Sequence, residues 1–406
     1  MGEKTLFVGY NLSNDITQIS VYRPENAAIA IVGATPDNPD GIWETSIGLH
    51  DGKNSIRNFV ADLQAGRQVY AAGKPVGGVK ALTHYFKKTL SLTKRFYPQE
   101  MIRQLVITTE EPSKEFTKLI YEALENLGIG RERARVISHK QSFLYYVMSQ
   151  EKSLWTNDVG MFEYHNGRLI YQQMNMNRRS RPILVGVSRK DYTERMTLAL
   201  DGVADEGDVF ESIARSAVHK QILSALYMTG NGFECEWAQE ILQKLCVGRR
   251  VFLGNNLYVA GAGYAAREFG VESRLNDYIF LDEDMIQASI TIKVYADAKE
   301  QELYLAKAGT PWYQVEREFG IIPDDDNELA IHIRYILQRD VETQIVPLEE
   351  LRGRTDRMVR LSLNIRFADA STCILTIKDK GFGNLMPSSN RIWEKIIVLR
   401  EKGSSL

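Results

Sequence analysis

The chain has 406 residues, of which 44% are hydrophobic and 25% charged, and its formal net charge is −2. This is the composition of a folded globular protein of two or three domains, without a general attraction to nucleic acid or to anionic membranes. The three cysteines are too few for a disulfide framework, the six histidines lack zinc-site spacing, and no apolar run approaches the length of a membrane-spanning helix. We expect a soluble cytoplasmic protein with no metal site and no nucleic-acid partner.

The first elements are two short strands joined by a polar turn within residues 5–22. Leu6–Val8 is the first apolar run, and Ile16, Ile19 and Val21 carry the second. Helical patterns follow over residues 55–65 and 76–97, where apolar side chains recur at a spacing of three and four residues.

Residues 104–150 predict a strand, a helix, a second strand and a second helix. A short buried strand at Leu105–Thr108 precedes Pro112 and Ser113, which open a helix that Gly128 ends. Another strand at Val136–Ile137 leads into a helix that ends at Met148. This order requires a right-handed crossover between two parallel strands.

Residues 158–172 predict a hairpin, because Asn166-Gly167 is a strong two-residue turn signal. A helix is then predicted over residues 208–224 and a short strand over 226–228, which enters the sequence Thr229-Gly230-Asn231-Gly232. Two more helices are expected over residues 237–245 and 258–268.

After about residue 274 the pattern changes to alternation of apolar and polar side chains. Three runs show it, starting at Ile290, Leu329 and Leu361. Alternation with a period of two is typical of half-buried antiparallel strands. We therefore predict an α/β region over residues 1–274 and a β-rich domain, most simply a sandwich, over residues 275–406.

Four segments in this order resemble the phosphate-1, connecting, phosphate-2 and adenosine segments of the actin and seventy-kilodalton heat-shock chaperone ATPase superfamily. They are Leu6–Ser20, Leu105–Met148, Asp158–Gln172 and Leu226–Phe233. The whole chain is also similar to a group of bacterial chaperone-like proteins that end in a β-rich domain. The resemblance implies two related α/β, ribonuclease-H-like lobes with a nucleotide cleft between them.

The segments that would hold phosphate and magnesium lack the required residues. Glycines let backbone N–H groups approach phosphate oxygens, and carboxylates hold hydrated magnesium. In the first hairpin, Asn11 stands at the acidic position and Ser13 at the glycine position, followed by Asn14 and then Asp15 two residues late. In the second hairpin, Glu163 keeps the acidic position, but a tyrosine and a histidine follow it and would occupy phosphate space.

The adenosine loop is the best preserved segment. Gly230 and Gly232 would let the backbone approach a purine, with Asn231 between them and Phe233 behind. We then expect ATP or ADP to bind weakly here if at all, and Gly230→Val to abolish binding without unfolding the protein. Alternatively, the two glycines form only a tight strand-to-helix turn.

Gly261, Gly263 and Ala266 also fit the dinucleotide pattern G-x-G-x-x-G/A. That motif requires a preceding strand and a helix that starts at the glycines. Small residues in this pattern equally suit a helix packed closely against a neighbour.

Two loops of the β-rich domain contain large apolar residues, namely Trp312 and Tyr313 in the first and Phe382, Leu385 and Met386 in the second. Such residues in loops pack under the sheet or anchor a partner. They are our candidates for contacts with a protein partner.

Three hypotheses follow. In the first, the protein is a non-catalytic, chaperone-like scaffold with a degenerate ATPase domain and no catalytic residue. The second is a weak ATPase or nucleotide-gated chaperone with a rearranged site. The third is a dinucleotide-binding enzyme that uses Gly261 and Gly263.

Overall fold

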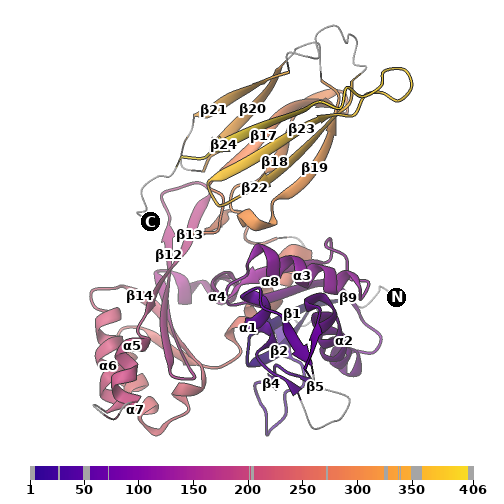
Figure 1. The fold of residues 1–406 in the computed structure, drawn as a ribbon. Coiled ribbons are helices and arrows are strands. Elements are labelled where there is room, and N and C mark those ends of the chain that lie inside the picture. The colour runs from indigo at the N-terminus through magenta and orange to yellow at the C-terminus, as the bar shows by residue number, and fades with distance from the viewer. Residues whose placement is uncertain are drawn as a thin grey trace. The chain divides into compact units, whose positions relative to one another are not determined.

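The computed structural model describes residues 5–25, 28–48, 55–71, 73–200, 202, 205–270, 273–323, 328–336, 338, 340–348 and 359–400. The chain is a mixed α/β protein that divides into two compact units (Figure 1). The first comprises Met1–Met176 and Val187–Asn276, and the second comprises Asn177–Gly186 and Asp277–Leu406. The main boundary lies two residues from the predicted one, and the segment Asn177–Gly186 belongs with the second unit.

The first lobe of the first unit is built on a sheet in the order β10-β9-β1-β2-β3, with β4 paired to β2. Its strands are β1 Thr5–Leu12, β2 Ile16–Arg23, β3 Ala28–Ile31, β4 Trp43–Glu44, β9 Met101–Thr109 and β10 Ala134–Ser138. Two small hairpins pair β5 Ile47–Gly48 with β6 Ser55–Ile56 and β7 Val69–Ala71 with β8 Lys74–Val76. The helices are α1 Phe59–Gln64, α2 Gly78–Phe96, α3 Lys114–Glu125 and α4 His139–Met148.

The core of this lobe forms where the apolar stripes of its helices meet the sheet. Phe59, Phe86 and Phe116, from α1, α2 and α3, are all fully buried in one cluster with the β1 and β9 side chains. Helix α3 begins at the predicted cap, where the Ser113 hydroxyl accepts a hydrogen bond from the Phe116 amide at 3.1 Å. The predicted strand–helix–strand–helix unit of residues 104–150 is therefore present.

The second lobe is built on a sheet in the order β15-β14-β11-β12-β13-β16. Its strands are β11 Asp158–His165, β12 Arg168–Asn177, β13 Ile183–Asp191, β14 Leu223–Thr229, β15 Arg250–Leu253 and β16 Tyr278–Leu281. Its helices are α5 Thr193–Leu200, α6 Glu206–Ala217, α7 Glu236–Leu245 and α8 Leu257–Gly270, with single 3₁₀ turns η1 Lys152–Trp155 and η2 Asn231–Phe233. The first four residues of β13 pair with β16 in the second unit.

The two sheets of the first unit share one pairing pattern. In the first, β1 pairs antiparallel with β2 and parallel with β9, which pairs parallel with β10. In the second, β11 pairs antiparallel with β12 and parallel with β14, which pairs parallel with β15. Each lobe therefore starts with a hairpin and adds two parallel strands beside the first strand of that hairpin.

Two predicted helices have the wrong bounds. The pattern over residues 55–65 gives α1 only from Phe59, because Ser55–Ile56 form strand β6. The helix expected over residues 208–224 ends at Ala217, and β14 begins at Leu223, earlier than predicted. Lys220 between them has a left-handed backbone with φ 58°, which a helix cannot accommodate. The apolar residues from Leu223 onward belong to a buried strand, whose short apolar run is not distinguishable from a helix by periodicity alone.

Helices α4 and α8 cross at very close range because glycines stand at the contact. A Cβ atom on Gly261 of α8 would lie 2.0 Å from the carbonyl oxygen of Ser142 in α4. The Ser142 hydroxyl donates to the Tyr258 carbonyl at 2.6 Å, and Ser20 of β2 donates to the Val259 carbonyl at 2.7 Å. The glycines of the dinucleotide-like pattern lie inside α8, with no strand leading directly into them, so the geometry that motif requires is not present.

The second unit contains two four-stranded antiparallel sheets. One has the order β18-β17-β20-β21, formed by β17 Ala288–Ala296, β18 Lys299–Ala306, β20 Glu328–Tyr335 and β21 Val341–Pro347. The other has the order β19-β22-β23-β24, formed by β19 Glu316–Ile321, β22 Leu361–Phe367, β23 Thr372–Asp379 and β24 Ile392–Val398. Inward side chains of both sheets, such as Ile290 and Leu363, share one core cluster. The predicted strand-rich C-terminal region is therefore present, as a sandwich.

The part of the chain that the structure describes contains no helix with the length and apolarity needed to cross a membrane.

Candidate functional site

The turns of the two lobe hairpins, β1–β2 and β11–β12, line one cavity of about 450 Å³ in the first unit. The end of β9, the start of α4, the residues after β14 and the start of α8 also line it, as do Ile42, Asn58 and Gln64 beside β4 and α1. Most of the lining side chains are polar or charged, as in a site for a polar ligand.

Seven of the nine residues predicted to contact nucleotide line this cavity. They are Asn11, Ser13, Asn14, Asp15, Glu163, Gly230 and Asn231. The other two, Gly232 and Phe233, do not, which corrects the sequence-based assignment. Phe233 is 2% exposed and packs against Tyr164 and Phe210 in the core of the second lobe.

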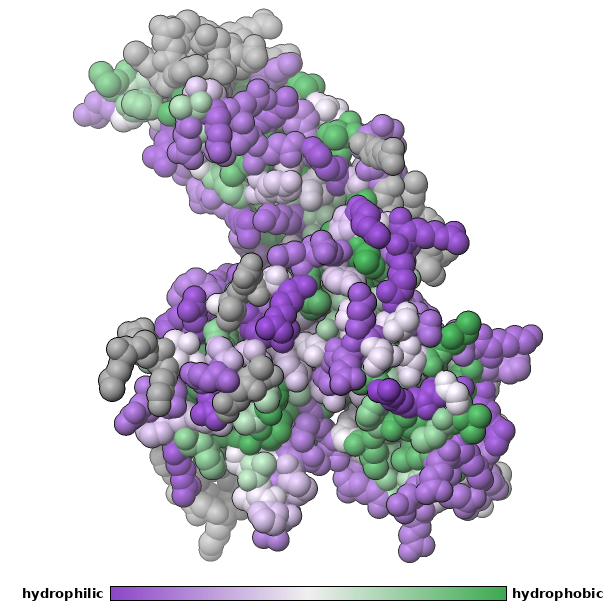
Figure 2. Space-filling model, turned by 180° about the vertical axis from the view of Figure 1, so that it is seen from behind, coloured by the Kyte–Doolittle hydropathy of each residue, from purple (hydrophilic) through white to green (hydrophobic). Residues whose placement is uncertain are grey.

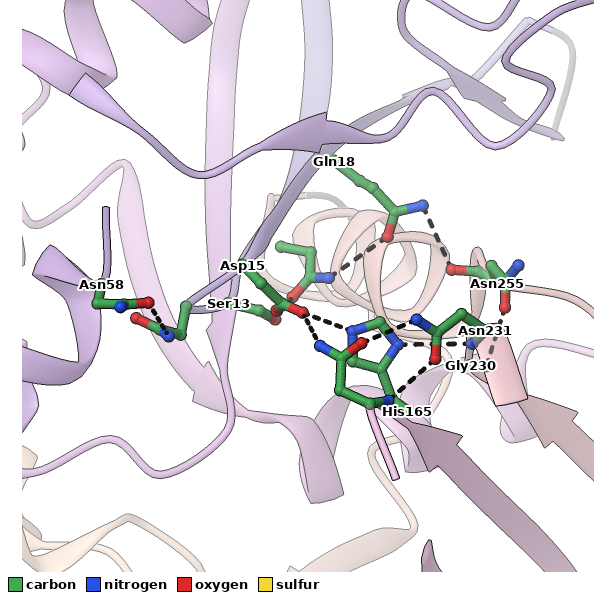
Figure 3. Close-up of polar contacts among 11 residues, drawn as sticks. Ser13, Asp15, Gln18, Asn58, His165, Gly230, Asn231 and Asn255 are labelled. Carbon is green, nitrogen blue, oxygen red and sulfur yellow. Dashed lines mark hydrogen bonds and ion pairs between the residues drawn. The ribbon is translucent and has the colours of Figure 1, made fainter. Parts of the chain in front are cut away.

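The two hairpins bind each other directly across the cavity (Figure 3). His165 Nε2 of the second hairpin lies 2.5 Å from Asp15 Oδ2 of the first, and Asn166 Nδ2 donates to the same oxygen at 2.8 Å. The hydrogen bond from His165 lowers the pKa of Asp15, and the bond to Asp15 raises the pKa of His165. Both shifts favour the charged pair.

The adenosine-like loop is part of the same network. Asn231 Nδ2 donates to Asn166 Oδ1 and the Asn166 amide donates to Asn231 Oδ1, each at 2.9 Å. The Gly230 amide donates to Asn255 Oδ1 at 2.9 Å. The polar groups of this loop therefore form hydrogen bonds with the second hairpin and with the segment before α8. Asn255 was missed by sequence reasoning, because only its place before the small-residue helix marks it.

Asn11, which stands where the resemblance places a magnesium-associated acid, is 1% exposed and fully engaged. Its amide nitrogen donates to Gln18 Oε1 at 3.3 Å, and its Oδ1 lies 2.9 Å from His139 Nε2. Ser13 Oγ donates to the same Asn11 oxygen at 3.2 Å. A neutral amide with these partners does not supply the charge that a hydrated metal needs.

His139 and Tyr258 form the floor of the cavity, and the sequence analysis missed both in this role. Their rings stack with centroids 4.0 Å apart. Burial lowers the pKa of His139 to about 3, so its imidazole is neutral at pH 7. Tyr258 donates to Glu163 Oε2 at 2.7 Å, and burial raises the pKa of Glu163. This floor offers no positive charge to a phosphate.

The remaining charged groups of the cavity are also paired. Glu110 of the first lobe binds Arg168 of the second at 2.5 Å and lies 3.4 Å from Arg189. Glu234 accepts a hydrogen bond from Asn255 at 3.2 Å. Among the described residues, no group of three or more His, Cys, Asp or Glu side chains has an arrangement that could hold a metal ion.

The structure corrects the predicted role of Tyr164. Side chains alternate along β11, so Glu163 and His165 face the cavity while Tyr164 points into the second lobe, 2% exposed. Its hydroxyl donates to Glu206, and its ring lies against Gly232, where a Cβ would be 2.0 Å from Tyr164 Cδ1. Of the two bulky residues, Tyr164 and His165, only His165 lines the cleft.

Gly230 is required by the fold and not only by an approaching ligand. Its φ is 105°, and a Cβ atom would lie 2.2 Å from the carbonyl oxygen of Tyr164. The expectation that Gly230→Val leaves the fold intact is therefore wrong. The alternative, a tight turn after the strand, describes this glycine.

The Asp15–His165 pair predicts a pH-dependent stability. A histidine with a raised pKa stabilises the folded protein below about pH 6.5 and loses this effect as the pH rises through its folded-state pKa. An aspartate with a lowered pKa contributes above about pH 4 and loses its effect as the pH falls further. The melting temperature of the wild type should therefore exceed that of His165→Gln most between about pH 4 and 6.5.

Because both side chains are partly exposed, the pair should contribute no more than about 1 kcal/mol. Thermal denaturation of both proteins from pH 3 to 9 measures this difference. His219→Gln, at an exposed position outside the cavity, is the matched control and should show no such maximum. A difference between wild type and His165→Gln that is flat across this range would contradict the ion pair.

Comparisons with known proteins give families but no activity. A model of the C-terminal part of a family of unknown function (DUF5716) matches residues 47–283, which is more than half of the chain. A model of a domain of unknown function (DUF8552) matches residues 285–399, which cover the strands of the sandwich. A comparison with curated proteins finds no match.

Proposed function

The chain belongs to a family of unknown function (DUF5716), and we propose that it is a non-catalytic, chaperone-like binding protein. In this proposal the first unit is a degenerate ATPase domain of the actin and heat-shock chaperone type, and the sandwich is the interaction domain. ATP or ADP, if bound, binds weakly.

The strand pairing that the two lobes share supports the proposal that the first unit is a degenerate ATPase domain. Each lobe starts with a hairpin, adds two parallel strands, and is followed by a helix, α4 or α8, at the centre of the unit. These helices pack against each other at Gly261 and Ser142. The order of the hairpins, the connecting segment and the Gly230 loop along the chain is the order on which the resemblance to the superfamily rests.

One observation carries the proposal that catalysis is lost: Asp15 and His165 bind each other where phosphate would lie between the hairpins. Phosphoryl transfer depends on positioned magnesium and on backbone N–H groups around the phosphates. Here Asn11 stands in place of the first acid. The Asn166 backbone N–H donates to the Asn231 side chain, and the Asn231 side chain donates to the Asn166 side chain. A triphosphate entering the cavity would have to break these contacts and meet the carboxylates of Glu110 and Glu163.

The loop that connects β23 to β24 supports the sandwich as the interaction domain. Asp379, which is 3% exposed, accepts hydrogen bonds from the amides of Gly381 at 2.7 Å and Ser389 at 2.8 Å. The loop held in this way leaves Phe382 44% and Leu385 82% exposed. A rigid loop with exposed apolar tips binds a partner without a large loss of conformational entropy.

The two predicted anchor loops differ in how exposed their large apolar side chains are. Met386 is partly buried, whereas Tyr313 is 7% exposed and Trp312 packs against the sandwich core. The Trp312 indole also donates to Asp284 at 3.3 Å. Trp312 therefore packs on the sandwich core and Tyr313 is buried beside it, so the proposed contact with a partner rests on Phe382 and Leu385 alone.

Leu385→Ser in the full-length protein should weaken binding to its partner by about tenfold without lowering the melting temperature. The reason is that an exposed apolar anchor contributes about 1–2 kcal/mol to an interface and nothing to the core. Affinity purification from extract of the source cell identifies the partner, and titration of that purified partner measures the loss. Ile322→Ser, at a 52% exposed position of the same unit, is the matched control. Equal binding by both variants would assign the partner to another surface.

A further inference from the structure

The first unit contains a second cavity, of about 400 Å³, that shares no lining residue with the cleft between the hairpins. Both lobes contribute to it, through β3 of the first sheet, the ends of β14 and β15 of the second, and helices α4 and α8. A molecule bound there would touch both lobes.

The lining of this cavity is aromatic and uncharged. Four rings contribute to it, those of Tyr146, Tyr227, Phe252 and Tyr264, and none of its lining side chains is ionisable except through a tyrosine hydroxyl. The rings of Tyr227 and Phe252 stack with centroids 5.1 Å apart, and Tyr146 meets Tyr227 edge to face at 5.4 Å. Flat rings arranged in this way favour a planar, uncharged occupant, because a buried charge would find no counter-ion.

Tyr227 provides a polar group without a partner. The residue is 4% exposed, and its hydroxyl is buried without a hydrogen-bond partner. Buried hydroxyls in proteins are nearly always paired, since the unpaired state carries a desolvation cost. The hydroxyl itself has almost no accessible surface, so a molecule in the cavity would contact the Tyr227 ring and not this hydroxyl.

The rim of the cavity is apolar and accessible. Phe252 is 37% exposed and Leu253 57% exposed, both on β15 at the edge of the second sheet. Figure 2 shows that the surface of the first unit has green apolar patches among its purple polar side chains. Exposed apolar groups beside a cavity are typical of a binding site.

We propose that this cavity binds a small, uncharged, planar molecule that stacks on its aromatic rings. The volume lies within the range of small-molecule pockets, and the aromatic, uncharged walls specify the chemistry of the ligand. The proposal concerns this cavity alone and does not depend on the loss of catalysis in the cleft.

Nile red is a suitable probe, because it is planar, uncharged and carries a carbonyl acceptor. The full-length protein should bind it saturably with one-to-one stoichiometry, as measured by fluorescence titration. The anionic dye 1-anilinonaphthalene-8-sulfonate should bind at least about tenfold more weakly, because the cavity has no cation to pair with its sulfonate. Equal binding of both dyes, or no saturable binding of Nile red, would overturn the proposal and leave the cavity to an apolar side chain of a protein partner.

Two variants test whether the dye binds in this cavity. Leu253→Asp should abolish one-to-one binding, whereas Val247→Asp, at a 79% exposed position of the same lobe outside the cavity, should not. Tyr227→Phe should leave dye binding unchanged, because it keeps the ring and removes only a hydroxyl that has almost no accessible surface in the cavity. Dye affinity that is unchanged in Leu253→Asp, with its fold verified by circular dichroism, would show that the dye binds elsewhere.

Discussion

Gly230→Ala will lower the stability of the first unit by several kcal/mol, much more than Gly248→Ala. Both glycines have a positive φ, 105° and 78°, so both substitutions strain the backbone. At Gly248 nothing lies within 4 Å of the added Cβ, whereas at Gly230 the carbonyl oxygen of Tyr164 lies 2.2 Å away. The common strain is about 1–3 kcal/mol, and the clash with backbone adds about 1–3 kcal/mol at Gly230 alone.

Differential scanning calorimetry of the two variants and the wild type measures this difference directly. The steric explanation requires a clearly lower transition temperature for Gly230→Ala than for Gly248→Ala. If the two variants melt together, the space beside Gly230 is free, and the loop could approach a purine as the resemblance implies.

Tyr313→Ala should destabilise the sandwich by about 3 kcal/mol, because it leaves a cavity where a buried aromatic ring had been. Tyr313 is 7% exposed, and its ring meets that of Trp312 edge to face at 5.8 Å. Leu385→Ala, in the loop after β23, should change stability by less than about 0.5 kcal/mol, since its side chain is 82% exposed. Urea denaturation of the full-length variants gives both values. A stable Tyr313→Ala protein would return this residue to the list of possible partner anchors.

The hairpins and the order of strands follow from signals that lie close together in the sequence. Asn166-Gly167 predicts a two-residue turn, and both residues have the positive φ that such a turn needs, 50° and 78°. The alternating runs after residue 274 likewise predict strands, because the period of side-chain burial is a local property. These signals give many elements of both units and seven of the residues that line the cleft.

Contacts between distant segments could not be obtained in this way. His139 and Tyr258 lie in segments far apart in the sequence, and the pattern of neither segment predicts that their rings stack at the floor of the cavity. Which loop side chains pack inward is also decided by the second sheet of the sandwich, so Trp312 and Leu385 looked alike in sequence. Whether Tyr164 points into the cavity or into the second lobe depends on the register of β11. A shift of one residue would turn its side chain to the other face of the sheet.

Calorimetric titration of the full-length protein with ATP tests most directly whether the protein's own side chains occupy the phosphate region of the cleft. The titration is done with and without magnesium, and hydrolysis is measured on the same samples. We expect no binding or weak binding that magnesium does not strengthen, and no turnover above that of buffer, because Asp15, His165 and Asn166 already satisfy one another. Tight, magnesium-dependent binding with turnover that is lost in Glu163→Gln or Asp15→Asn would contradict the account and identify a working ATPase.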